Sequence, residues 1–284
     1  MSDGRPLRIA LASFAEKPEG EGGEGLVSAA LAERGACPEW VVWNDPAVDW
    51  SGYDLIVIRC TWDYPDRLDA FRAWVNAPAV ATRVVNPPNL VLANLHKGYL
   101  ADMGDIAVPT VVIPAGMTVD LGLLRWPQVV VKPAVGVGGI GAVRAATQAD
   151  LERLTLAPSG AVDAIVQPYL ASVEDYGEVS VVCIEGEPSH AVHKLPAAGE
   201  FRIHDHWGGT AEPVELAAAD VAVARAALGT LHSTPAYARV DLIHDGERPR
   251  VIELELIEPY LWFELAPHAA GRLADTVLRR ARHR

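Results

Sequence analysis

Short, nearly continuous apolar runs alternate with amphipathic segments over the first part of the chain. Residues 7–13 and 54–59 are such runs, each bounded by polar or turn residues, and this pattern predicts buried strands. The segment 24–35 between them predicts a helix that ends at Gly35. Strands that alternate with helices are typical of an open α/β layer, so we expect a parallel sheet over about the first 85 residues.

Two further segments carry helical signals before the pattern changes. Asp66 is a suitable N-cap for a helix over 66–77, which a proline follows directly. The segment 84–104 passes from a proline turn into a helix that is expected to carry both Lys97 and Tyr99.

Beyond a domain boundary expected near 86–93, strand patterns dominate, and a mixed α+β body should follow the parallel domain. Gly186 and Gly246 lie in turns between two strands, so each pair of strands is expected to form an antiparallel hairpin. Helices are expected over 147–155, 213–231 and 271–284. Extended structure is predicted over 108–114, 128–133, 141–145, 164–170, 177–186, 188–195, 237–246 and 248–258.

Charge and cysteine content narrow the function classes. The 24 Lys and Arg against 37 Asp and Glu give a net charge of -13, which opposes a non-specific grip on nucleic-acid phosphate. Cys37, Cys60 and Cys183 are far apart and odd in number, which favours a reducing compartment. The chain shows neither a signal-peptide pattern nor an apolar run of membrane-spanning length, so we expect a cytoplasmic protein without membrane or nucleic-acid partners.

Acidic residues gather on the two late strands. Glu253 and Glu255 are two positions apart, so their side chains share one face of a strand, and a hairpin would bring Asp241 beside them. Crowded carboxylates are tolerated when they are protonated or neutralised by cations, and hard oxygen ligands suit Mg²⁺. A solvated strand face is the alternative interpretation.

A glycine-rich loop follows an apolar strand that ends at Lys132. Exposed backbone N–H groups of such a loop are suited to bind phosphates. The same string matches GxGxxG, so a dinucleotide site is a second interpretation and an ordinary glycine hairpin a third. The residues after the loop resemble a strand, whereas a dinucleotide fingerprint should open a helix. The loop glycines are Gly136, Gly138, Gly139 and Gly141.

The segment 193–210 is too rich in glycine, aromatic and charged residues to be a plain core strand, and it predicts a site loop. It contains Lys194 and Arg202. His204 and His206 suggest a metal site, but alternate histidines without further ligands favour solvent-facing side chains.

Three other features are ambiguous by themselves. Lys97 alone is equally consistent with a solvated surface lysine. The segment 167–170 contains a proline of the kind that commonly ends a strand. Residues 62–64 follow a buried strand's Arg59 at the edge where open α/β sheets place ligands, although their aromatic rings also suit core packing.

Taken together, these motifs in this order resemble the ATP-grasp superfamily over essentially the whole chain. The resemblance implies an ATP-grasp fold with a parallel α/β domain over 1–90, a central unit with the glycine-rich lid over 91–165 and a C-terminal unit with the metal carboxylates over 166–284. It implies that Lys97 and Lys132 hold nucleotide phosphates and that the loop Gly136–Gly141 is a mobile lid.

The resemblance also assigns an adenine hinge, a ribose contact and metal ligands. Either Glu174 or Glu178 is expected on the ribose. Many members of the superfamily have asparagine where this chain has Glu255, which adds a negative charge beside the metals. The hinge residues are Gln167, Pro168, Tyr169 and Leu170, and the metal ligands are Asp241, Glu253 and Glu255.

Several strings are similar to the branch that contains the cycloserine-forming O-ureido-serine cyclo-ligase. They are R-C-T-W-D-Y, H-K-x-Y-L, G-E-V-S, S-H-A-V-H-K, G-E-F-R followed by G-G-T, and E-L-E-L-I-E-P. The branch implies a ligase that uses ATP and Mg²⁺, with Mn²⁺ as a substitute, to activate the carboxylate of a small amino acid derivative as an acyl phosphate. Arg202, Arg239 and Lys194 are the expected catalytic cations, because such groups bind phosphoryl and oxyanion oxygens.

We expect an intramolecular ring closure of the cycloserine type. An intermolecular amino-acid or peptide ligase is the alternative within enzymes, and a non-catalytic nucleotide-binding regulatory protein is the alternative outside them. The presence of both lysines and all three carboxylates opposes the regulatory interpretation. The sequence leaves the substrate identity and the oligomeric state open, a homo-oligomer included.

Overall fold

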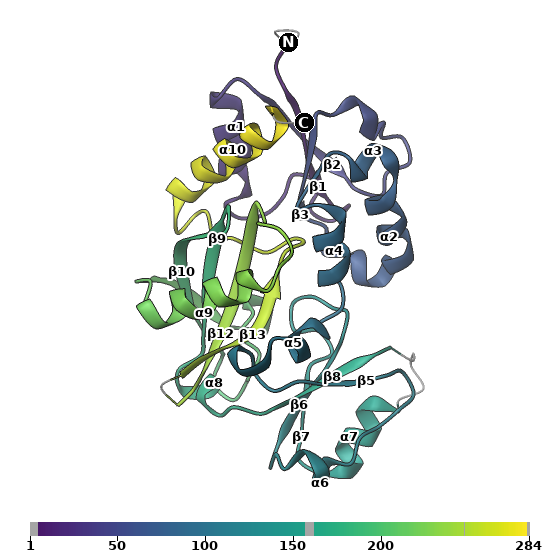
Figure 1. The fold of residues 1–284 in the computed structure, drawn as a ribbon, viewed down its shortest axis with the longest axis vertical. Helices are drawn as coiled ribbons and strands as arrows, with labels where there is room; N and C mark the ends of the chain where they lie inside the picture. Colours follow the sequence, from purple (N-terminus) through teal and green to yellow (C-terminus); the bar gives the residue numbers. More distant parts are fainter. Residues whose placement is uncertain (1–4, 157–161, 247, 283–284) are drawn as a thin grey trace.

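The computed structural model describes residues 5–156, 162–246 and 248–282 of the chain. Three sheets are spread along its long axis, with the N-terminal sheet at one end and a small middle sheet at the other (Figure 1). A five-stranded C-terminal sheet lies between these two (Figure 1). The chain therefore reaches the far end of the molecule halfway through and then returns.

The N-terminal sheet is parallel, as the sequence predicts, with the strand order β2-β1-β3-β4. The apolar pattern does not indicate β2, because that strand contains a proline and most of its positions are exposed or half-buried. The strands are β1 Arg8–Ser13, β2 Cys37–Val42, β3 Leu55–Cys60 and β4 Val84–Val85.

Two helices from opposite ends of the chain lie side by side on this domain, α1 Glu24–Glu33 and α10 Pro267–Arg282 (Figure 1). Their buried residues join one hydrophobic core with residues of β1 and β3. Arg34 Nε lies 2.7 Å from Asp275 Oδ1 and links the two helices. The last helix begins at Pro267 and not at the expected residue 271, because proline is well tolerated at a first helical position.

The expected helix 66–77 is shorter at its start. A 3₁₀ turn covers Tyr64–Arg67, and α2 Leu68–Asn76 follows it. Asp66 lies inside the turn and Arg67 is the N-cap of α2, without a side-chain capping bond. The expectation that Asp66 caps this helix is therefore wrong, because the proline before it begins a turn at Tyr64.

The single helix expected around Lys97 is also wrong. The segment forms two short helices, α4 Pro88–Asn94 and α5 Tyr99–Asp102, and Lys97 lies in the bend between them. The backbone N–H of Lys97 donates to the carbonyl of Ala134 at 2.7 Å, outside this segment. A backbone donor used in this way cannot continue the helical ladder.

The middle sheet is antiparallel, with the order β5-β8-β6-β7. Thr147 caps α7 Gln148–Thr155 through a capping box with Asp150. The division of the chain into three units stays a prediction, and this sheet favours a boundary after Pro168. The strands are β5 Val111–Ile113, β6 Val129–Pro133, β7 Val143–Ala145 and β8 Ala164–Pro168.

The C-terminal sheet is antiparallel, with the order β11-β10-β9-β12-β13, and both expected hairpins are present. Glu185 and Gly186 both have positive φ in the first turn, as a tight hairpin requires. The strands are β9 Glu178–Ile184, β10 Glu187–Leu195, β11 Thr210–Val214, β12 Tyr237–Asp245 and β13 Arg248–Glu255.

The edge strand β11 includes residues that the sequence pattern assigns to a helix over 213–231. Pro213 pairs opposite Val192, and helix α9 begins only at Ala218 and ends at Gly229. Proline is tolerated in an edge strand because its missing N–H faces no further strand. The other short helices are α3 Pro78–Ala81, α6 Leu121–Leu124 and α8 Ser172–Asp175.

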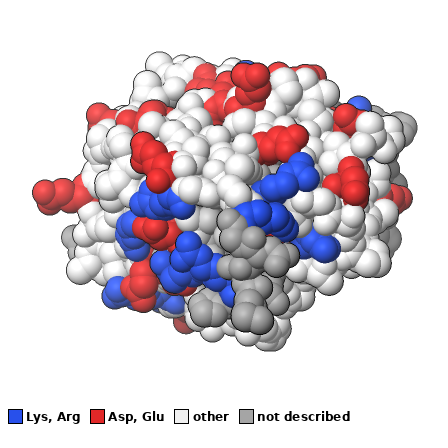
Figure 2. Space-filling model, turned by 90° about the horizontal axis from the view of Figure 1, so that it is seen from above, with Lys and Arg blue, Asp and Glu red and all other residues white. Residues whose placement is uncertain are grey.

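Charged residues of both signs are interspersed on the face seen in Figure 2. Ion pairs such as Arg5 with Asp54 and Arg279 with Glu185 agree with this mixture. All three cysteines are free, and only Cys37 is exposed. No helix among the described residues is long and apolar enough to cross a membrane.

Candidate active site

A cavity of about 920 Å³, open solvent at its mouth included, lies between the middle sheet and the C-terminal sheet. Strands β6 and β8 form one wall, and β12 and β13 form the opposite wall. Most of the residues expected at the site line it together. They are Lys97, Lys132, Gly136, Gly138, Gly139, Gln167, Pro168, Tyr169, Leu170, Glu178, Arg202, Asp241, Glu253 and Glu255.

Lys97 reaches the cavity from the bend between α4 and α5. Its Nζ lies 2.9 Å from Glu253 Oε1 and donates to the carbonyl of Gly136 at 2.6 Å. Burial opposes the charged form, but the Glu253 carboxylate outweighs it and raises the pKa of Lys97. The side chain is therefore a charged lysine that faces the glycine loop, and the interpretation as a surface lysine is wrong.

Lys132 lines the cavity from the neighbouring strand β6. Burial, with a smaller repulsion from Lys97, lowers the pKa of Lys132 despite the attraction of Glu253. Lys132 pairs opposite Ile165 of β8, and two residues away Val130 pairs opposite Gln167. The lysine and the expected adenine hinge therefore lie on adjacent strands of one sheet.

The glycine loop connects two antiparallel strands, since Val131 of β6 pairs with Val143 of β7. A dinucleotide fingerprint opens a helix, so this topology excludes that interpretation. Gly139 has a φ of 67°, and a Cβ added there would lie 3.1 Å from His204 Nδ1. Gly141 lies outside the cavity lining, and a Cβ there would be 2.9 Å from Pro133 Cγ.

The expected hinge lies at the end of β8. Tyr169 lines the cavity, its hydroxyl bonds to Glu174, and its ring lies 3.8 Å from the guanidinium carbon of Arg144. Glu174 is 51% exposed at its side chain and pairs with Arg144 at 3.0 Å. Glu178 instead lines the cavity with a side chain that is 12% exposed.

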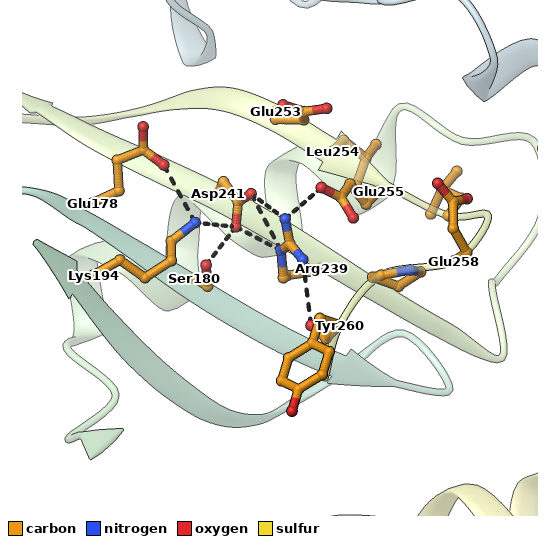
Figure 3. A network of polar contacts seen from close by, with 12 residues as sticks. Glu178, Ser180, Lys194, Arg239, Asp241, Glu253, Leu254, Glu255, Glu258 and Tyr260 are labelled. Carbon is orange, nitrogen blue, oxygen red and sulfur yellow. Dashed lines mark hydrogen bonds and ion pairs between the residues drawn. The ribbon is translucent and has the colours of Figure 1, made fainter. Parts of the chain in front are cut away.

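The carboxylates meet across the hairpin of β12 and β13. Asp241 pairs opposite Glu253, and Arg239 pairs opposite Glu255 (Figure 3). Arg239 donates to Asp241 at 2.9 Å and 2.8 Å and also contacts Glu255. Lys194 Nζ lies 3.3 Å from an Asp241 oxygen, so this carboxylate is paired with two cations.

The surroundings shift the pKa values of Asp241 and Glu255 in opposite directions. Burial alone would raise the pKa of Asp241, but Arg239 and Lys194 outweigh it and hold that pKa well below its usual range. Burial raises the pKa of Glu255 to about 7, with further contributions from Glu253 and Asp241 that Arg239 only partly offsets. The two acids therefore differ in how readily they lose a proton, although Arg239 contacts both of them.

No group of three or more His, Cys, Asp or Glu side chains arranged to hold a metal is found in the described part of the chain. The expected carboxylates do converge, but their oxygens are paired with Lys97, Lys194 and Arg239. Mg²⁺ is commonly held by one or two carboxylates together with substrate phosphates. The oxygen donors of Asp241 and Glu253 fit that kind of site.

Arg202 lies in the expected site loop and lines the cavity. Its guanidinium pairs with Glu200 at 2.5 Å, and the guanidinium carbon lies 3.3 Å from the Trp207 ring centroid. His206 is exposed, whereas His204 lines the cavity. Burial lowers the pKa of His204 to about 4, with help from Lys194 and Arg239, so the expectation that both histidines face solvent holds only for His206.

Sequence reasoning overlooks Ser180, and it correctly places Arg59 in a buried strand. The Ser180 hydroxyl donates to Asp241 from β9, and the only signal in the sequence is its place in a strand next to acidic residues. Arg59 is fully buried and pairs with Glu24 at 2.6 Å, away from the cavity. Tyr64 stacks on Phe71 with centroids 4.9 Å apart, in agreement with core packing.

Comparisons with known proteins identify two parts of the chain. The family model of the D-cycloserine synthetase DcsG N-terminal domain matches residues 9–86. The model of the prokaryotic glutathione synthetase ATP-grasp domain matches residues 97–257. The two matches together span the parallel domain and the cavity.

Individual relatives agree. The cycloserine biosynthesis protein DcsG of Streptomyces lavendulae is 31% identical over 261 residues, which cover 84% of this chain and 87% of that protein. The glutathione synthetase of Ralstonia nicotianae is 28% identical over 210 residues, which cover 70% of this chain and 63% of that protein.

Solved structures extend the likeness to the whole fold. The crystal structure of D-cycloserine synthetase DcsG superposes with a TM-score of 0.84 at 27% identity and covers 96% of this chain and 99% of that chain. A D-alanine–D-alanine ligase from Bacillus anthracis has a TM-score of 0.67 at 13% identity over 98% of both chains, which shows the fold alone. The chain therefore belongs to the ATP-grasp family of ATP-dependent ligases, in the group with the DcsG type of N-terminal domain.

Proposed function

We propose that the chain activates the carboxylate of a small amino acid derivative with ATP and closes an intramolecular C–N bond, as in cycloserine formation. The observation that carries the proposal is the match of residues 9–86 to the DcsG N-terminal domain. This domain packs against the C-terminal unit. The ATP-grasp match alone would fit an intermolecular ligase equally well.

The cavity residues suit the binding of a nucleotide triphosphate. Lys97 and Lys132 are assigned to the phosphates and the loop Gly136–Gly141 to the lid above them. We assign the adenine to the hinge 167–170. Glu178 is preferred to Glu174 on the ribose, because only Glu178 lines the cavity.

ATP-grasp ligases use a divalent metal, and here we propose Mg²⁺, with Mn²⁺ as a substitute. Asp241 and Glu253 would hold the ion together with phosphate oxygens, and Glu255 would complete the set after release from Arg239. The ion would offset the negative charge of the transferring phosphoryl group. Its binding requires the internal cations to move from the carboxylates to the phosphates.

Two steps then follow from substrate chemistry. A substrate carboxylate oxygen attacks the γ-phosphorus, the bond to ADP breaks, and an acyl phosphate forms. A nitrogen of the same molecule attacks the acyl carbon, phosphate leaves, and the nitrogen loses a proton. Arg239, Arg202 and Lys194 are assigned to the phosphoryl and oxyanion oxygens, which guanidinium and ammonium groups bind well. Tethering the nucleophile makes the second step effectively unimolecular.

A panel of amino acids that includes O-ureido-serine tests the proposal. Ring closure predicts one ADP per product and, when a single amino acid is supplied, a ring lighter than the substrate by one water. From O-ureido-serine this ring still carries the carbamoyl group on its nitrogen, and hydrolysis of that group to carbon dioxide and ammonia leaves cycloserine. If ADP forms only after a separate amine is added, and the product mass is the sum of both substrates minus water, the intermolecular ligase replaces ring closure. Removal of divalent metal with a chelator should stop ADP formation, and Mg²⁺ should restore it.

A further inference from the structure

A buried carboxylate without a partner lies just beyond the end of β13. Glu258 is 6% exposed, and among the described residues its carboxylate has neither a hydrogen bond nor a cation within 4.0 Å (Figure 3). Every other acid of the neighbouring cluster has such a cation. The pairs are Glu253 with Lys97, Glu178 and Asp241 with Lys194, and Asp241 and Glu255 with Arg239.

Glu258 lies where the N-terminal domain meets the C-terminal sheet. The indole N–H of Trp62 donates to the Glu258 carbonyl at 3.2 Å. Tyr64 is 3% exposed, and burial, followed by the charge of Glu258, raises the pKa of its phenol well above the usual range. Both aromatic residues follow β3, at the sheet edge where open α/β folds place ligands.

This position differs from the nucleotide cavity. Glu253 and Glu255 line that cavity, whereas Glu258 does not belong to its described lining. In Figure 3 the Glu258 side chain lies beyond Glu255, on the side away from Asp241 and Lys194. Glu258 is thus beside the site of phosphoryl transfer but on the side of the N-terminal domain.

An unpaired carboxylate at such depth is costly unless a cation neutralises it. Neither Lys97 nor Arg239 comes within 4.0 Å of the Glu258 carboxylate, because each is paired with another acid of the cluster. A cation supplied from outside would remove this cost. The α-ammonium group of an amino acid is such a cation, and only one carbon separates it from the carboxylate to be activated.

We propose that Glu258 binds the α-ammonium group of the amino acid substrate, with the Trp62–Tyr64 turn closing the subsite. The inference rests on the proposed function and narrows the substrate class to amino acids with a free α-amino group. It also explains why a turn of the N-terminal domain is bonded to the residue that recognises substrate: the Trp62 contact fixes the backbone of Glu258.

The test compares Glu258→Gln, which keeps the size and removes the charge, with Glu258→Asp and with the exposed control Glu215→Gln. The substrates are O-ureido-serine and its analogue without the α-amino group. Glu258→Gln should raise KM for O-ureido-serine by about 10- to 150-fold, the range for loss of a hydrogen bond to a charged group. KM for ATP should stay within about twofold, because the nucleotide contacts are elsewhere.

The deamino analogue gives the decisive control. The analogue should be an equally poor substrate for wild type and for Glu258→Gln. Glu258→Asp should keep part of the wild-type preference for O-ureido-serine over the analogue, and Glu215→Gln should keep all of it. A loss of the same size with both substrates would overturn the inference, because it would show a general role of Glu258 in folding or phosphoryl transfer. Thermal shift with ADP and Mg²⁺ checks that each variant is folded.

Binding alone separates this inference from ring closure. Calorimetry with ADP and Mg²⁺ measures the affinity for the same amino acid panel and the deamino forms without any need for turnover. If amino acids bind wild type more weakly after Glu258→Gln but no ring forms, the ammonium subsite stands and the proposed reaction fails. If ring closure occurs and both proteins bind every amino acid equally, the reaction stands and the subsite is wrong.

Discussion

Two buried arginine–carboxylate pairs in this protein have nearly the same local geometry. Arg59 donates to Glu24 at 2.9 Å and 2.6 Å, and Arg239 donates to Asp241 at 2.9 Å and 2.8 Å. All four side chains are at most 7% exposed. The difference lies in their surroundings.

The Arg59 guanidinium is paired with a single carboxylate, and its Nη1 has no hydrogen-bond partner among the described residues. One carboxylate faces one guanidinium, and the carbonyl of Pro259 accepts a further hydrogen bond at 2.8 Å, which links β3, α1 and the segment after β13. The Arg239 pair is open, since its carboxylate also contacts Lys194 and lines a cavity. In this protein the buried ion pair at the candidate site is the one whose carboxylate has two cations and lines the cavity. The other buried pair joins elements of the fold.

The largest expected effect is the loss of activity when the Arg239–Asp241 pair is broken. Asp241→Asn should lower ADP formation by at least about 100-fold, because it removes a proposed metal ligand and the negative charge that Lys194 and Arg239 share. Coupled ADP release measures the rate, and circular dichroism checks the fold. Glu253→Gln should give the same result. Normal turnover in both variants would show that the metal site is misplaced.

Breaking the Arg59–Glu24 pair should instead lower the stability of the protein. Glu24→Gln is expected to lower the free energy of unfolding by about 3–5 kcal/mol, because it leaves the Arg59 guanidinium charged, buried and without its carboxylate. Urea denaturation measures the change. The turnover of the protein that remains folded should equal that of wild type. A stable variant with impaired chemistry would reverse our assignment of the two pairs.

Loss of either phosphate lysine should have a smaller effect that is confined to nucleotide binding. Lys132→Ala and Lys97→Ala should each weaken ATP binding by about 1.5–3 kcal/mol, the contribution of a hydrogen bond to a charged group. Isothermal titration with ATP and Mg²⁺ measures this. Lys17, whose side chain is 42% exposed and pairs with Glu21, provides a matched control, and Lys17→Ala should leave ATP affinity unchanged. Wild-type affinity in both cavity variants would remove the proposed phosphate contacts.

The smallest effect concerns the glycine loop. Hydrogen exchange in 136–141 should be fast without nucleotide and slower with ATP bound, because glycines leave the free loop many conformations. Gly139→Ala should lower the free energy of unfolding by about 1 kcal/mol, because φ at this position is 67° and the added Cβ would approach His204. Slow exchange already in the free protein would contradict a mobile lid.

Local patterns identified most of the fold, because apolar runs and turn residues report on burial and chain reversal within a few positions. The parallel sheet, the two hairpins and the strand–loop–strand around the glycines all follow from such signals. The edge strand β2 and the break at Lys97 do not. Edge strands are only partly buried, and the bend depends on a hydrogen bond to Ala134, far along the chain.

The sequence by itself also determined which residues are suited to the chemistry, because lysines, paired glycines and carboxylates at strand spacing carry that information in their types. Only the tertiary structure decided how these groups are paired. Arg59 and Arg239 each lie within an apolar strand. Arg59 meets a single carboxylate in the core, whereas Arg239 meets two, Asp241 and Glu255, beside a cavity. Charge interactions act between residues that folding brings together, so whether Glu258 has a partner is visible only in three dimensions.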